Sequence, residues 1–127
     1  MRYLLDTHTF LWCFEGSIKL SKTAKEILLE TDTPKYISIA SLWEFSVKYS
    51  TGKLPFDGGL LYLCKLIKQY EFVILPISQR QLAAMIDLPF IHRDPFDRLL
   101  VATAKTDGLT ILTADENIQK YDVLSAW

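Results

Sequence analysis

Acidic residues follow or flank apolar segments at four distant points of this 127-residue chain. If those segments are parallel strands of one sheet, their carboxyl ends lie at one edge, where ligands bind in open α/β sheets. Clustered carboxylates raise one another's pKa values unless a cation neutralises them. All-oxygen sites suit Mg²⁺ or Mn²⁺, ions that activate water and hold phosphates. The pattern predicts metal-dependent phosphodiester hydrolysis by Asp6, Glu44, Asp97 and Asp115, with Asp94 as a fifth candidate.

Each acid also has a purely structural interpretation. Ser41 and Glu44 have the spacing of a capping box, and Asp94 before Pro95 fits a helix N-cap followed by a first-turn proline. The other acids could cap helices or close turns in the same way. Ser, Thr and Asn also cap helices, so four caps at one edge that are all acidic would be unusual. The segment 78–81 has such a box without any acid.

Short apolar segments alternate with segments of helical periodicity, and these are the elements that must position the acids. The alternation predicts βαβ units, and hence an α/β/α sandwich with a mainly parallel sheet of about five strands covered on both faces. At 127 residues the chain should form one domain, 1–127. We expect strands at 3–5, 36–39, 72–77, 110–114 and 123–127, a helix carrying Phe10, Leu11 and Phe14, and further helices at 21–30, 41–49, 60–70, 78–87, 95–106 and 116–121.

The composition narrows the class of protein. Half of the residues are hydrophobic and 23% are charged, which favours a packed core over disorder. No apolar run is long enough for a membrane span or a signal peptide, and two cysteines do not make a disulfide framework. We therefore expect a cytoplasmic protein without membrane contact. A net charge of −1 argues against nucleic-acid binding by bulk positive charge, but not against binding through metal ions.

The motifs around the acids resemble those of the PIN-domain ribonucleases, and most closely the VapC-like toxins of bacterial type II toxin–antitoxin modules. Each motif is short, but four in this order and spacing cover nearly the whole chain. The resemblance implies a PIN-like nuclease domain. The matching segments are Leu4–His8 with Leu11 and Trp12, Ile39–Glu44, His92–Leu100 with Ala102, and Leu112–Asp115.

The resemblance implies a Mg²⁺- or Mn²⁺-dependent endoribonuclease. Asp6 and Asp97 would be the principal metal ligands. Glu44 and Asp115 would complete the site, directly or through water, and orient the hydrolytic water. Asp94 would support the site as an N-cap.

A second group of residues has weaker assignments. The family places small hydroxyl residues near its first and last acids, which here are Thr7 and Thr113. Arg98 would pair with Asp94 or contact an RNA phosphate, with the pairing preferred. His92 is expected to be a loop or core-edge histidine.

The resemblance further implies a cognate antitoxin protein, an RNA substrate and a homodimer. The antitoxin of such modules lies across the helices that begin at the site. Most aromatic residues on these helices should pack in the core, and some would form a groove for that partner. Five lysines form a scattered basic rim whose usual role is solvation. The aromatic residues are Trp12, Phe14, Trp43, Phe45 and Tyr49, and the lysines are Lys19, Lys22, Lys25, Lys48 and Lys53.

Other functions remain open at this point. An α/β phosphohydrolase also gathers acids at strand ends, but the segment Asp6–His8 lacks the second carboxylate that an aspartyl-phosphate enzyme needs. A PIN nuclease that processes RNA without being a toxin would share every motif. A non-catalytic binding module is disfavoured by the complete set of acids.

Overall fold

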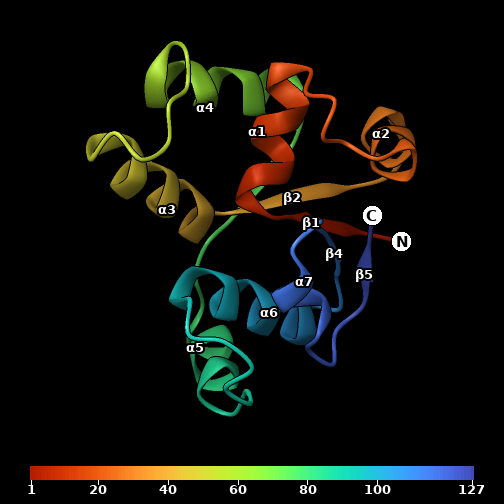
Figure 1. Cartoon of the computed structure of the whole chain (residues 1–127). Coiled ribbons are helices and arrows are strands. Elements are labelled where there is room, and N and C mark those ends of the chain that lie inside the picture. The colour runs from red at the N-terminus through yellow and green to blue at the C-terminus, as the bar shows by residue number, and fades with distance from the viewer.

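The computed structural model describes all 127 residues and contains one five-stranded sheet. Every strand pairing is parallel, and the strand order is β3-β2-β1-β4-β5 (Figure 1). From β1 the chain therefore adds β2 and β3 on one side. It then returns to the other side of β1, where it adds β4 and β5. The strands are β1 Tyr3–Leu5, β2 Lys35–Ser38, β3 Val73–Leu75, β4 Thr110–Leu112 and β5 Ser125–Ala126.

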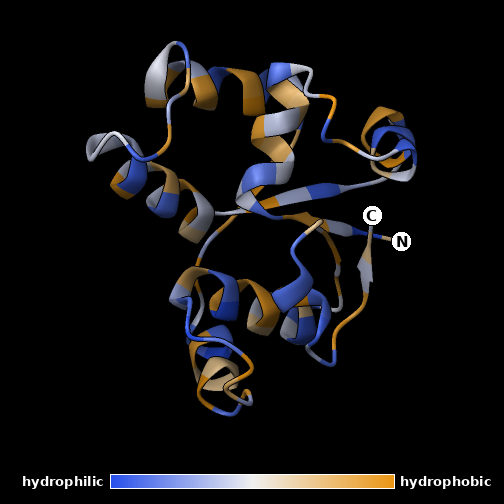
Figure 2. Ribbon diagram, viewed as in Figure 1, coloured by the Kyte–Doolittle hydropathy of each residue, from blue (hydrophilic) through white to orange (hydrophobic).

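Helices cover both faces of the sheet, as the alternation of segments predicted. Helices α1 to α4 lie on one side in Figure 1 and α5 to α7 on the other. Amphipathic character is visible along them in Figure 2, where hydrophobic and hydrophilic residues alternate on single helices. The helices are α1 Thr7–Glu15, α2 Lys22–Leu29, α3 Ile39–Ser50, α4 Gly59–Gln69, α5 Gln79–Ile86, α6 Pro95–Asp107 and α7 Glu116–Gln119. None of them is long and apolar enough to span a membrane.

The core divides into two parts because successive strand residues point to opposite faces. Leu5 and Leu112 belong to a cluster of 14 buried residues under α1, α3 and α4. Leu4 and Ile111 belong to a cluster of 10 buried residues under α6 and α7. Both faces of β1 and β4 are buried, which agrees with the consecutive apolar residues Leu4–Leu5 and Ile111–Leu112. The predicted α/β/α architecture is confirmed.

The boundary between β2 and α3 was predicted wrongly. Ile39, expected in the strand, is the first residue of α3, and the Ser38 hydroxyl caps this helix by accepting a hydrogen bond from the Ala40 N–H. Ser41 and Glu44 form no capping box, and Glu44 lies in the second turn. The box at Ser78–Gln81 is present as predicted.

Candidate active site

A small polar cavity of about 90 Å³ lies at the carboxyl edge of the sheet. No hydrophobic residue lines it. All five candidate acids contribute to its wall, although they come from the starts of α1, α6 and α7 and from the second turn of α3. The lining residues are Asp6, Thr7, His8, Glu44, Lys48, Asp94, Asp97 and Asp115.

Asp6 is held by hydrogen bonds to both of its oxygens. Oδ1 accepts a hydrogen bond from the Thr9 N–H at 2.8 Å, which caps α1, and lies 2.9 Å from the Thr9 hydroxyl. Oδ2 accepts one from the hydroxyl of Thr113, which follows β4. Burial raises the pKa of Asp6, and the hydrogen bonds from Thr113 and Thr9 only partly oppose that rise. The folded chain therefore fixes this carboxyl group at a site that favours its neutral form.

Each oxygen of the Glu44 carboxylate accepts a hydrogen bond from a different residue. The Thr7 hydroxyl donates to Oε1, and the Lys48 ammonium donates to Oε2 at 2.6 Å. Glu44 is only 5% exposed, so these donors replace the water that its charge would otherwise attract. Lys48 and Glu44 meet because they are four residues apart on α3.

Asp94 and Asp115 are helix caps, as their structural interpretation predicted. Asp94 Oδ1 accepts from the N–H groups of residues 96 and 97, and Asp115 Oδ1 accepts from those of residues 117 and 118. Each carboxylate nevertheless lines the cavity. Capping and a role in the site are therefore compatible, because one oxygen caps and the other has no protein partner.

Asp97 lies among the other carboxylates of the cavity. Its pKa is raised to about 7, first by burial and then by the neighbouring charges of Asp94, Asp115 and Glu44. A hydrogen bond from His92 opposes the rise. Five carboxylates thus share one small cavity with a single lysine, and the cavity is short of positive charge.

This donor set fits a hydrated Mg²⁺ or Mn²⁺ better than a fully protein-bound ion. No group of three or more acidic, His or Cys side chains is arranged as a ready-made cation cage. Mg²⁺ usually keeps several waters and uses only one or two carboxylates. The excess of buried negative charge and the oxygen-only chemistry of the acids both favour such an ion.

Three contacts differ from expectation or were missed. Arg98 does not pair with Asp94: it is 5% exposed, and its guanidinium donates to main-chain carbonyls and the Tyr121 hydroxyl, so it is also not available to RNA. His92 lies partly buried in the loop before α6, as expected, but its contact with Asp97 at 3.1 Å was missed. Lys48, predicted as one of a scattered rim, lines the cavity. Its spacing from Glu44 was the signal for that position.

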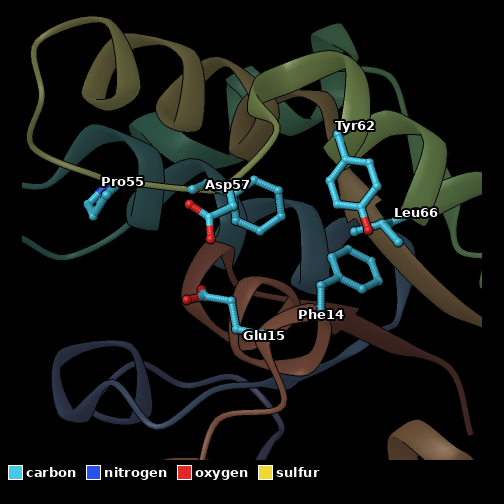
Figure 3. Close-up of a pocket in the computed structure, with 7 residues that line it drawn as sticks. Phe14, Glu15, Pro55, Asp57, Tyr62 and Leu66 are labelled. Atoms are coloured by element: carbon cyan, nitrogen blue, oxygen red, sulfur yellow. The ribbon is translucent and has the colours of Figure 1, made fainter.

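A larger cavity of about 380 Å³ lies between α1 and α4 (Figure 3). Aromatic side chains wall it, and the carboxylates of Glu15 and Asp57 lie on the same side of it. The aromatic residues expected mostly in the core, with some in a partner groove, divide in the structure: Phe45 is fully buried, Trp12 and Phe14 are partly buried against the same core, and Trp43 and Tyr49 are exposed. Of these residues only Phe14 lines this cavity. The lining residues are Phe14, Glu15, Pro55, Phe56, Asp57, Tyr62 and Leu66.

Solved structures with this fold include toxin–antitoxin complexes. VapBC2 from Rickettsia felis, bound to a promoter DNA fragment, matches with a TM-score of 0.74 and 15% identity, over 99% of this chain and 98% of that one. FitAcB from Neisseria gonorrhoeae matches with a TM-score of 0.67 and 21% identity, over 97% and 95%. The PIN domain endonuclease Utp24 matches with a TM-score of 0.54 and 17% identity, over 93% and 74%. At these identities the likeness shows a shared fold.

The sequence comparisons agree with this architecture. No curated protein matches the chain. The family model of the PIN domain, a nuclease domain, matches residues 3–124 and so covers all four acidic motifs and every strand but β5. The chain belongs to the PIN domain family.

Proposed function

We propose that this chain is a Mg²⁺- or Mn²⁺-dependent endoribonuclease that acts as the toxin of a toxin–antitoxin pair. The observation that carries the proposal is the convergence of five carboxylates on one cavity lined only by polar residues. The cavity has no hydrophobic lining on which a nucleobase could stack, whereas its carboxylates can hold a divalent ion and, through that ion, a phosphate group. The chemistry would therefore act on the RNA backbone, with the bases outside.

Asp6 and Asp97 would hold the ion, and Glu44 and Asp115 would complete the site directly or through water. When bound, the ion supplies charge neutralisation for the phosphate and a more acidic water. Glu44, fixed at both oxygens, is suited to orient a water at one place rather than to move with the ion. Asp94, Thr7 and Thr113 support this arrangement by capping α6 and by hydrogen bonding to the acids.

The antitoxin would dock at the cavity between α1 and α4. Solved structures of this fold include a toxin–antitoxin complex from Klebsiella pneumoniae and a member of the VapBC family of toxin–antitoxin systems from Mycobacterium tuberculosis. In this chain the cavity combines apolar walls with two carboxylates. An amphipathic segment that inserts an apolar side chain and pairs a basic residue with Glu15 or Asp57 would match it. Phe14 and Tyr62 would provide the aromatic contacts.

A homodimer would use the exposed face of α3. Ile39, Trp43 and Val47 are spaced at intervals of four residues, so they lie along one side of the helix, and they are 40%, 59% and 42% exposed. A second copy of the chain would cover this apolar stripe.

The deciding experiment is RNA cleavage by the purified chain with Mg²⁺, with Mn²⁺ and with EDTA, beside D6N and D97N. Cleavage that requires the metal and is lost in both variants supports the proposal. Metal-independent cleavage, or full activity in both variants, would refute it.

Expression of the chain alone should slow bacterial growth, and co-expression of the cognate partner should restore it. Cleavage without any growth defect would instead favour an RNA-processing PIN nuclease.

A further inference from the structure

A chain of four side chains leads from a buried arginine to the acidic cavity. Arg98 Nη1 lies 3.2 Å from the Tyr121 hydroxyl, which lies 2.9 Å from His92 Nδ1. His92 Nε2 in turn lies 3.1 Å from Asp97 Oδ2. Arg98 and Tyr121 are 5% and 4% exposed, and the His92 side chain is 13% exposed. Water therefore has little room to replace any of these contacts.

The distances favour one order of donors in this chain. An arginine only donates, so the Tyr121 oxygen accepts from Arg98, and the His92 main-chain N–H points to the same oxygen at 3.5 Å. The Tyr121 hydroxyl has two acceptors within reach, His92 Nδ1 at 2.9 Å and the His92 main-chain carbonyl at 3.5 Å, and the shorter contact, to Nδ1, receives its proton. The imidazole must then bear its proton on Nε2, where it faces Asp97.

The arginine at the start of the chain is itself immobile. It has no carboxylate partner, because the two ion pairs of the structure are Lys48–Glu44 and His92–Asp97. Its guanidinium instead stacks 4.1 Å from the centre of the Phe90 ring. The remaining N–H groups donate to the main-chain carbonyls of Met85, Leu88 and Pro89. Arg98, which is on α6, thus holds the end of α5 and the start of the loop that carries His92.

We propose that His92 is a positioning residue for Asp97, oriented by Tyr121 and Arg98 so that Asp97 Oδ2 is held and Oδ1 is left for a divalent cation. This inference rests on the proposed function, since it assigns a purpose to the metal site. Asp97 stands in the first turn of α6, and His92 is the one residue that forms a hydrogen bond with its side chain. Without His92 the carboxylate could rotate away from its neighbours to relieve their repulsion.

The protonated nitrogen of His92 can be observed directly in the metal-free protein. The chain has only two histidines, so long-range ¹H–¹⁵N spectra of the imidazoles, with H8N for assignment, will identify His92. We expect Nε2 to be protonated and Nδ1 bare in the wild type. In Y121F, which keeps the ring but removes the hydroxyl, we expect a mixture of both tautomers. A proton on Nδ1 in the wild type would overturn the chain of donors.

Mn²⁺ affinity, measured by titration calorimetry, tests the positioning itself. H92L should bind Mn²⁺ about 10- to 100-fold more weakly, the loss typical when a residue behind a metal ligand is removed. H92Q offers an amide N–H close to the position of Nε2 and should restore most of the affinity, which a merely structural role would not predict. Y121F, the milder change, should lose about tenfold.

The outcomes separate this inference from the proposed function. Wild-type affinity in folded H92L, or in Y121F if H92L does not fold, would refute the role of His92 while leaving the metal site intact. No Mn²⁺ binding by the wild type would refute the metal site, and with it the part of this inference that concerns the cation. Weak binding in H92L and H92Q alike would refute positioning by an Nε2–H donor.

Discussion

Asp6 and Thr113, 107 residues apart in sequence, share a hydrogen bond beside the boundary between β1 and β4. This boundary is where the winding of the sheet changes direction, the place at which open α/β sheets leave a crevice for ligands. The pairing of the first and fourth strands therefore sets the orientation of the first acid. The site can form only once the two ends of the domain have come together.

Removal of the Asp97 charge should stabilise the metal-free protein at alkaline pH. Its pKa of about 7 in the folded state lies above the ordinary value of 3.8, so the folded state binds more protons between these values. Stability should therefore fall as pH rises from about 4 to about 7, by at most about 4 kcal/mol, and stay low above that. D97N should lose the part of this fall that Asp97 causes, while the part due to the raised pKa of Asp6 remains, and in EDTA at pH 8 it should melt several degrees above the wild type.

The exposed Asp122 provides the matched control, since D122N removes a charge outside the cavity. It should show the same pH dependence of melting as the wild type. Mg²⁺ should raise the melting temperature of the wild type and D122N at pH 8, but raise that of D97N much less. Identical pH slopes for D97N and the wild type would contradict the electrostatic account.

The D115N variant distinguishes the helix-capping role of Asp115 from a role in RNA cleavage. Its Oδ1 caps α7, and Asn caps a helix about as well as Asp, so D115N should change the free energy of unfolding by less than about 0.5 kcal/mol. Cleavage should fall at least about tenfold, because the charge facing the cavity is gone. S21N exchanges one cap for another on α2 and should alter neither quantity. Unchanged cleavage in D115N would reduce Asp115 to a cap.

Lys48 acts as the internal counter-charge of the cavity. Burial lowers its pKa, but the hydrogen bond to Glu44 and the charges of Asp94 and Asp97 raise it, and the net direction is upward. K48M should destabilise the metal-free protein by about 0.5–1 kcal/mol and increase the stabilisation that Mg²⁺ provides. K53M, at an exposed lysine, is the control for both. Equal Mg²⁺-induced shifts in melting temperature for K48M and the wild type would argue against this role.

Two glycines with positive φ distinguish backbone strain from a steric clash. Gly52 (φ 73°) has open space where a Cβ would be, whereas a Cβ on Gly58 (φ 97°) would meet Tyr62 at 2.7 Å. G52A should cost about 1 kcal/mol, and G58A about 1–3 kcal/mol more. Because Tyr62 lines the cavity between α1 and α4, only G58A should also weaken antitoxin binding, as measured by calorimetry. Equal losses of stability and of antitoxin binding in G52A and G58A would show that the Tyr62 side chain moves aside without cost.

The apolar stripe on α3 predicts the oligomeric state. The wild type should run at twice the monomer mass in light scattering, and V47E should run as a monomer, because a carboxylate would be buried in the interface. T23E, which adds a charge on the exposed side of α2, should leave the dimer intact. A monomeric wild type would refute the assignment of this face.

The apolar segments that form the strands could be predicted from the sequence because burial requires them, but only the end of β1 was placed correctly, and every later strand ends one or two residues before its expected end. Asp6 and Asp115 follow the neighbouring parallel strands β1 and β4, so their convergence follows from the sheet, whereas Asp97 comes after helix α5 and reaches the cavity through the placement of α6. The start of α3 could not be placed, because Ile39 favours a strand while the Ser38 cap begins a helix.

The partners of His92 and Arg98 depend on the path of the loop after α5. His92 meets Tyr121 across 29 positions, and Arg98 bonds to carbonyls whose direction no sequence pattern encodes. An opposite-charge pair between Arg98 and Asp94 was expected because the two residues are four positions apart in the sequence. It fails because Asp94 turns to its own helix end, where two N–H groups lack partners.

Three of the acids in the cavity also cap helices, and this has a genetic consequence. The caps are Asp6, Asp94 and Asp115, and asparagine satisfies the same N–H groups. Aspartate and asparagine codons differ by a single base. In a host poisoned by this chain, selection for survivors should therefore enrich two kinds of mutant. One kind carries a truncated gene. The other carries a point mutation, and its protein still accumulates at full length, still folds and still binds the antitoxin.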